Sequence, residues 1–285
     1  VKELRPVLKN VTIGITLGDP SGIGPEITVK ALSLRDLWDD ARLVVIGNRN
    51  VLTDTLNIVG SEQQLLEIND PAEAQGYGHI NFIECGVPTK MLDYGKVSKE
   101  GGEAAYTYIT RGIKLALQDK IDAVVTGPLH KEALAEAGCP YPGHTEIFAS
   151  QTGTKDYAMM LAAGPLRVVH VSTHVSLRQA CDLATKERVL ATIELTWRGL
   201  CQLGIKEPRI GVAGLNPHAG EGGLFGDEEI KEIIPAIEAA RQKGLNVEGP
   251  IPPDTAFIKG RDGQYDAVVA MYHDQGHIPV KVAGF

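Results

Sequence analysis

The amino-acid sequence predicts an α/β protein built around a mostly parallel sheet. Short apolar runs alternate along the chain with longer stretches of helical spacing, as they do in βαβ units. Polar, Gly-containing motifs follow several of these apolar runs directly, which is typical of strands that lead into binding loops. With 285 residues, 43% of them hydrophobic, the chain is long enough for one large domain or two ordinary ones.

The expected elements follow from the apolar periodicity. Strands are predicted at residues 11–17, 42–46, 121–126, 167–172, 209–213 and 267–271. Helices are predicted at residues 27–37, 106–118 and 230–243. Gly18 and Gly127 stand immediately after the first and third predicted strands, where a turn has to begin.

Five polar clusters begin where predicted strands end. They are residues 18–26, 127–132, 173–174, 215–221 and 272–277. In open α/β sheets, ligands bind beyond the carboxyl ends of the strands. We therefore expect the five clusters to gather at one site.

The composition argues against several classes of function. The formal net charge is −8 and Lys and Arg form no run, so we expect no nucleic-acid partner. No apolar run is long enough to span a bilayer and no leader peptide is visible, so we expect a cytoplasmic protein without a membrane partner. The four cysteines form no CxxC pair, which disfavours a thiolate zinc site.

Three histidines lie in motifs that follow strands: His174, His218 and His273. Three neutral imidazoles can hold a divalent metal ion and leave positions open for a substrate. A single histidine is more often a structural hydrogen bonder, but three at equivalent strand ends favour a metal site. Asp274, beside His273, is expected to be a partner of that histidine or a weak ligand.

Other motifs leave two interpretations open. The glycines of residues 18–26 suit either an anion bound at a helix N-terminus or a tight structural turn. Thr145 is expected to cap the helix that follows, whereas His144 beside it is available to phosphate or carboxylate oxygens. Lys131 and Lys281 could pair with an anionic substrate or shuttle a proton. His170, inside a predicted strand, is expected to be a core histidine.

Eight motifs, taken in order, resemble the 4-hydroxythreonine-4-phosphate dehydrogenase family of vitamin B6 biosynthesis. They are residues 16–26, 127–132, 141–146, 171–174, 216–221, 226–228, 253–255 and 272–277. The resemblance implies a two-lobed fold like that of isocitrate and isopropylmalate dehydrogenases, with the active site in the interlobe cleft. It predicts a first lobe of residues 1–130 plus 255–285, and a second lobe of residues 131–254 that makes dimer contacts.

The resemblance also implies a set of ligands. The family is a homodimer that binds a divalent cation (Zn, Mg, Mn or Co) near the dimer interface, with ligands drawn from both subunits. The metal ligands carry over onto His174, His218 and His273. Contacts with a small phosphorylated hydroxy acid carry over onto His144, Thr145 and Lys281, and Asp19 is expected to bind the substrate as well.

The implied reaction is the oxidation of a secondary alcohol by NAD or NADP to a 3-keto acid, which then loses carbon dioxide. A metal ion would polarise the hydroxyl and stabilise the alkoxide from which hydride leaves. A base must take the hydroxyl proton, and Lys131 and Asp254 are the candidates.

Residues 169–174 and 177–178 resemble a branch that acts on 4-phospho-D-threonate or 4-phospho-D-erythronate more than the enzyme that uses 4-phosphohydroxy-L-threonine. A cis-dihydrodiol dehydrogenase of an aromatic acid, a non-redox metal-dependent lyase or hydrolase, and a binding protein without activity are the alternatives. The family continues past Phe285 with an Asn and an Arg that contact substrate, so we expect the printed sequence to be incomplete.

Overall fold

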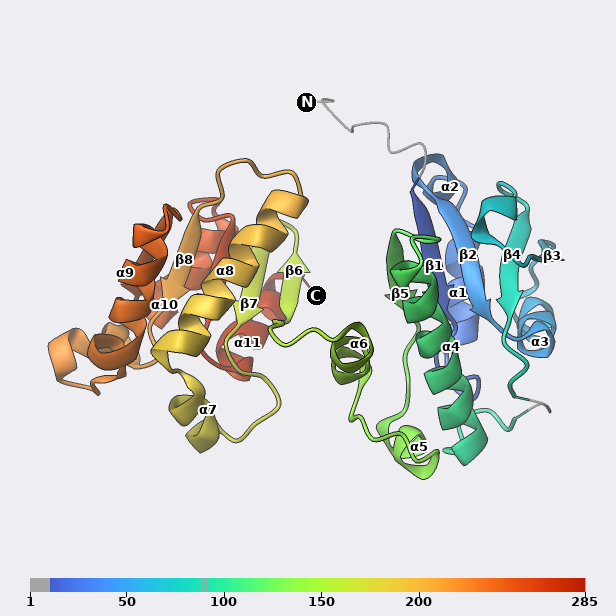
Figure 1. Ribbon diagram of the computed structural model, residues 1–285, viewed down its shortest axis with the longest axis horizontal. Coiled ribbons are helices and arrows are strands. Elements are labelled where there is room, and N and C mark those ends of the chain that lie inside the picture. Colours follow the sequence, from blue (N-terminus) through green and yellow to red (C-terminus); the bar gives the residue numbers. More distant parts are fainter. Residues whose placement is uncertain (1–10, 89, 91, 285) are drawn as a thin grey trace. The chain divides into compact units, whose positions relative to one another are not determined.

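The computed structural model describes residues 11–88, 90 and 92–284, and the chain divides into two compact units after Thr154 (Figure 1). Each unit contains its own five-stranded sheet with helices on both faces. The α/β prediction is therefore confirmed, although the strands form two sheets rather than one. No helix in the described part of the chain is long and apolar enough to cross a membrane.

The first sheet is entirely parallel and has the strand order β3-β4-β2-β1-β5. Its strands are β1 (Thr12–Thr16), β2 (Arg42–Gly47), β3 (Gln64–Glu67), β4 (His79–Glu84) and β5 (Ala123–Thr126). The central strand β2 is almost entirely buried, as the continuous apolar run of a parallel strand predicts. Strand β5 forms one edge of the sheet, and its Val125 is half exposed.

The helices of the first unit pack on this sheet. They are α1 (Gly24–Leu32), α2 (Leu37–Asp40), α3 (Arg49–Val59), α4 (Lys99–Leu117), α5 (Lys131–Glu136) and α6 (His144–Thr152). Figure 1 shows α4 in front of the sheet and α1 behind it. Beside α1 and α2, an apolar cavity of about 500 Å³ opens onto β1 and β5.

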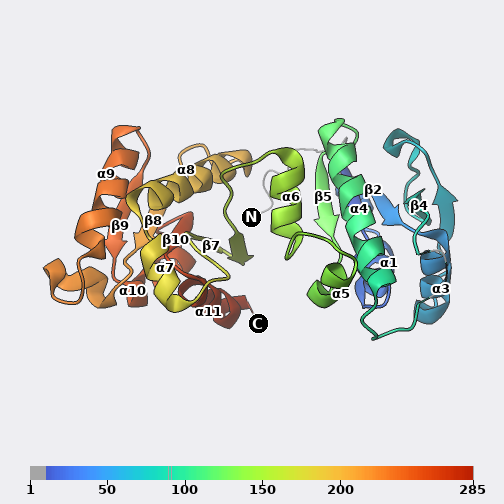
Figure 2. The same ribbon diagram turned by 60° about the horizontal axis from the view of Figure 1, so that its bottom comes forward.

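The second sheet has the order β6-β7-β10-β8-β9, and only β6 runs antiparallel to its neighbour. The strands are β6 (Met160–Ala163), β7 (Leu166–His170), β8 (Ile210–Ala213), β9 (Val247–Ile251) and β10 (Ala267–Ala270). Its helices are α7 (Leu177–Leu183), α8 (Lys186–Gln202), α9 (Ile234–Gln242), α10 (Pro253–Arg261) and α11 (His273–Gly284), which surround the sheet in Figure 2.

All six predicted strands are present, with bounds that shift by one or two residues. The predicted helices shift more. Helix α4 begins seven residues before the expected start, because the Ser98 side chain accepts a hydrogen bond from Gly101 N–H and caps it. The expected helix at 230–243 is a π-helical turn, Glu229–Ile233, followed by α9.

The division of the chain differs from the expected lobes. Residues 255–285 were expected to belong with the N-terminal lobe, but β10 lies between β7 and β8 in the second sheet. The apolar run 267–271 is fully buried there, and α11 packs beside β6 and β7. Residues 131–154, expected in the second lobe, form α5 and α6 of the first unit.

Candidate active site

The three predicted metal ligands follow three adjacent parallel strands of the second sheet. His174 comes four residues after β7, His273 three residues after β10, and His218 five residues after β8. Strand β10 pairs with both β7 and β8, so all three side chains originate at the same carboxyl edge. The predicted strand-end placement is correct for each of them.

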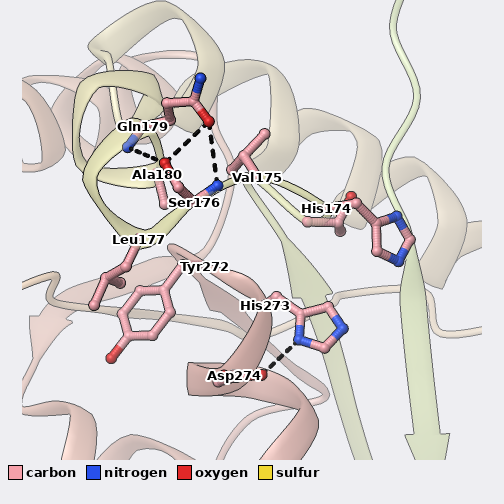
Figure 3. Close-up of a pocket in the computed structure, with 10 residues that line it drawn as sticks. His174, Val175, Ser176, Leu177, Gln179, Ala180, Tyr272, His273 and Asp274 are labelled. Carbon is pink, nitrogen blue, oxygen red and sulfur yellow. Dashed lines mark hydrogen bonds and ion pairs between the residues drawn. The ribbon is translucent and has the colours of Figure 1, made fainter.

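His174 and His273 lie close together at this edge, with ring centroids 5.7 Å apart (Figure 3). Asp274 Oδ1 lies 2.7 Å from His273 Nδ1, so a proton on Nδ1 leaves the lone pair on Nε2. Both histidines line a cavity of about 500 Å³ with Thr173 and Tyr272. An imidazole whose far nitrogen is held by a carboxylate is oriented as a metal ligand would be.

His218 lies on an unusual loop, residues 217–223. His218, Ala219 and Glu221 all have positive φ angles, 54°, 56° and 43°, which costs roughly 1–3 kcal/mol for each residue with a side chain. The buried carboxylate of Glu229 holds the start of this loop. Its Oε1 accepts hydrogen bonds from the backbone N–H of Leu215 and Asn216, at 2.7 and 2.8 Å.

The metal site stays a prediction. Within the described ranges, no three His, Cys, Asp or Glu side chains lie close enough to hold a metal ion together. The structure brings His174 and His273 together, and His218 stays exposed on its own loop beside Phe225. Imidazole nitrogens suit a divalent ion, and within one chain two of the three predicted ligands lie close together.

Two further histidines, His277 and His170, support His273. His277 stacks on His273 with ring centroids 3.6 Å apart. Its Nδ1 lies 3.0 Å from the His273 carbonyl oxygen and 3.2 Å from His170 Nε2. His170 is buried, as predicted, and its Nδ1 lies 3.3 Å from the Met159 carbonyl oxygen. Burial lowers the pKa of His170 to about 4, so this imidazole is neutral at pH 7.

In the first unit, two of the predicted clusters meet at the carboxyl edge of the first sheet. Asp19 N–H donates to the Pro128 carbonyl oxygen at 2.9 Å, which ties the loop after β1 to the loop after β5. Gly18 has φ +73°, and a Cβ there would lie 2.2 Å from that same oxygen. The structure thus gives the first glycine of the motif a packing role, the plainer of the two interpretations. The five clusters divide two and three between the sheets.

His144 begins α6, and the helix N-cap is Gly143. The prediction that Thr145 caps this helix is wrong, because Thr145 already lies in its first turn and no side chain caps it. His144 Nε2 is buried without a hydrogen-bond partner. Desolvation lowers the pKa of His144, and the nearby Gly127 carbonyl opposes that shift.

The remaining predicted residues are exposed. Lys131 is the first residue of α5, Asp254 lies in the first turn of α10, and Lys281 lies in the last turn of α11. Lys131 belongs to the first unit, whereas Asp254 and Lys281 belong to the second. The roles of all three stay predictions.

Sequence reasoning missed Glu229 and His277. His277 ends the motif of His273. No sequence motif contains Glu229, because only the fold brings its carboxylate to a loop 13 residues earlier.

The sequence matches a known protein family over most of its length. The family model of the pyridoxal phosphate biosynthetic protein PdxA matches residues 39–285. D-threonate 4-phosphate dehydrogenase from Cupriavidus necator is 49% identical over 274 residues, which cover 95% of this chain and 82% of that protein.

Solved structures agree with the sequence comparison. The 4-hydroxythreonine-4-phosphate dehydrogenase of Klebsiella pneumoniae superposes with a TM-score of 0.89 at 47% identity, covering 96% of this chain and 84% of that one. A terephthalate 1,2-cis-dihydrodiol dehydrogenase from Burkholderia xenovorans LB400 superposes with a TM-score of 0.70 at 30% identity, covering 96% and 83%.

Proposed function

Because the chain belongs to the family of the pyridoxal phosphate biosynthetic protein PdxA, we propose that it is a dehydrogenase that oxidises a small phosphorylated hydroxy acid with NAD or NADP. The observation that carries this proposal is the 49% identity to a D-threonate 4-phosphate dehydrogenase over nearly the whole chain. The strand-end histidines of the second sheet support it, since they supply the imidazoles that the sequence argument required.

The substrate that we favour is 4-phospho-D-threonate or 4-phospho-D-erythronate, with 4-phosphohydroxy-L-threonine as the other member of the class. The name of the Cupriavidus necator relative supports the D-acids, and so do residues 169–174 and 177–178. Oxidation of the secondary hydroxyl transfers a hydride to the nicotinamide ring and releases a proton. The resulting 3-keto acid then loses carbon dioxide.

We assign a divalent cation to His174, His218 and His273, with Zn, Mg, Mn and Co as the candidates. When bound, such an ion polarises the hydroxyl of the substrate as a Lewis acid. The adjacent pair of rings and the carboxylate on His273 support two of the three ligands. His218 is the third ligand in this proposal, in which the ligands come from both subunits of a homodimer.

The roles of the other residues follow the family. His144, Thr145, Lys281 and Asp19 bind the substrate in this proposal, and Lys131 or Asp254 takes the hydroxyl proton. A homodimer with the metal site at its interface would bring groups from two chains to one substrate.

The test is formation of NADH or NADPH by the metal-reconstituted protein with each of the three phosphorylated acids. Turnover of the D-acids alone supports the D-threonate assignment, and a preference for the L-amino acid moves the protein to vitamin B6 synthesis. If the protein binds metal but reduces neither NAD nor NADP with any of the three acids, the proposal is wrong. A non-redox lyase or hydrolase is then the better interpretation.

One second candidate has an observation in its favour. The similarity to a terephthalate cis-dihydrodiol dehydrogenase, with a TM-score of 0.70, supports oxidation of a dihydrodiol of an aromatic acid. Its identity of 30% is well below that of the phosphorylated-acid dehydrogenases, so it ranks second. A cis-dihydrodiol added to the same assay separates the two.

A further inference from the structure

Three side chains recur along one face of α11. His273, His277 and Lys281 are spaced four residues apart, so they lie one above another on the helix. His273 is an assigned metal ligand and Lys281 is a predicted substrate contact, whereas His277 between them has no role in the reaction proposed above. The structure gives His277 two neighbours, the ring of His273 and the ring of His170.

Carbonyl oxygens fix the position of the proton on two of these rings. His170 Nδ1 lies 3.3 Å from the Met159 carbonyl oxygen, and His277 Nδ1 lies 3.0 Å from the His273 carbonyl oxygen. Because a carbonyl oxygen only accepts, both Nδ1 atoms carry a proton, and each neutral ring keeps a lone pair on Nε2. His277 Nδ1–H can therefore also donate to His170 Nε2, which lies 3.2 Å away.

His170 is a firm anchor for this chain of hydrogen bonds. It is the last residue of β7 and is 1% exposed. Helix α11 packs closely on it, since a Cβ on Gly276 would lie 2.3 Å from His170 Nε2 and 2.7 Å from Val168 Cγ1. A larger residue at position 276 would push the helix away, so glycine there lets His277 reach His170.

His277 in turn supports one face of the His273 ring. The two ring planes are 13° apart and the centroids 3.6 Å apart. A metal ion lies in the plane of the imidazole that binds it, so two nearly parallel rings at this separation cannot both bind one ion. His277 therefore acts on the His273 ring and is not a ligand beside it. Asp274 holds only the edge of that ring (Figure 3), and its side chain is 71% exposed, so this contact alone orients the ring weakly.

We propose that His170 and His277 are positioning residues, which hold the His273 ring in the orientation that leaves its Nε2 free for a metal ion. A ligand already held in one rotamer loses less conformational freedom when the ion binds. The inference rests on the metal site of the proposed function, and it adds two residues to that site, neither of them a ligand.

The first experiment measures the Kd of Zn²⁺ for the full chain, by competition with a chromogenic chelator. We expect His277→Ala to bind Zn²⁺ about tenfold more weakly than the wild type, the usual size of the loss when a residue that orients a ligand is removed. Ile278→Ala is the matched control, because Ile278 is the next residue of α11 and is 60% exposed; it should leave the Kd unchanged. A merely structural His277 would lower the melting temperature with an unchanged Kd, which would overturn the proposal.

Two substitutions of His170 separate its hydrogen bond from its packing. His170→Gln places an amide oxygen near the position of Nε2, where it can still accept from His277, so the Kd of Zn²⁺ should stay close to that of the wild type. His170→Leu fills the site without an acceptor and should weaken Zn²⁺ binding in the direction of His277→Ala. Nitrogen NMR of the metal-free wild type should show the Nδ1–H tautomer at His170 and at His277. Equal Kd values for the two His170 variants, or the Nε2–H tautomer at His277, would contradict the proposal.

A failure of the metal site itself gives a different result. If the wild type binds Zn²⁺ no more tightly than His273→Ala does, the metal assignment is wrong, and the positioning role is wrong with it. If the wild type binds Zn²⁺ more tightly than His273→Ala but reduces neither NAD nor NADP, the dehydrogenase function fails. The Kd values of the His277 and His170 variants then still decide the positioning role.

Discussion

The loops at the carboxyl edges of the two sheets are held in different ways. At the first edge, backbone packs on backbone: Asp19 N–H bonds to Pro128, and Gly18 and Gly24 lie too close to carbonyl oxygens for a side chain. At the second edge, side chains hold the loops, as the Glu229 carboxylate does for residues 215–216. Close backbone packing thus holds the loops of the first edge, whereas a buried carboxylate holds the start of the His218 loop at the second.

The largest expected effect is a loss of turnover, caused by removing a predicted metal ligand at the second edge. His218→Ala should lower turnover by about a thousandfold or more, because a metal ligand contributes several kcal/mol of transition-state stabilisation. Steady-state kinetics, metal content by mass spectrometry and circular dichroism together check this. The control is His79→Ala in β4, which should keep full activity. Unchanged turnover in His218→Ala would remove that residue from the site.

The next effect tests the rigidity of the first edge. Gly18→Ala should lower the free energy of unfolding by about 3 kcal/mol or more, since it adds a clash with Pro128 O to an unfavourable φ. Gly138→Ala is the matched control, because Gly138 has nearly the same φ, +75°, with nothing within 4 Å of its Cβ. It should cost only about 1 kcal/mol. Urea denaturation measures both, and equal losses would mean that the close approach is not rigid.

Acid should weaken the second unit through His170. Its folded pKa of about 4 lies below the ordinary 6.5, so the unfolded chain takes up a proton before the folded one does. This contribution to stability is complete above pH 6.5 and falls by roughly 2–3 kcal/mol as the pH drops to about 4. Denaturation at several pH values checks it. His170→Gln should flatten the pH dependence between 6.5 and 4, and an unchanged slope would contradict the assignment.

The smallest effect concerns the loop of His218. Glu229→Gln keeps the shape of the side chain and removes the charge that accepts two backbone N–H groups. We expect a loss of about 2 kcal/mol in the free energy of unfolding, and weaker metal binding because the loop loses its anchor. Glu238→Gln, on a solvated face of α9, should change neither quantity. Similar behaviour of the two variants would show that Glu229 does not hold the loop.

The sequence predicted the strands that lead to both edges more accurately than the order in which those strands pair. Short apolar runs identified the strands, and the position of His174 and His273 after their strands follows directly from that. Periodicity carries no information on strand order, so the insertion of β10 between β7 and β8 was not foreseen. Nor could spacing reveal the Glu229 anchor or the hydrogen bond between His170 and His277, since both depend on which groups the fold brings together.

The open apolar cavity beside α1 and α2 has a practical consequence for every unfolding experiment above. Ile27 and Val125 at its rim are 46% and 51% exposed, so the native protein already offers a binding place to dyes that fluoresce in apolar surroundings. A dye-based melt would begin from a bright baseline and underestimate the transition. Intrinsic fluorescence is the better signal, because the chain has two tryptophans, Trp38 in the first unit and Trp197 in the second, and each reports on its own unit.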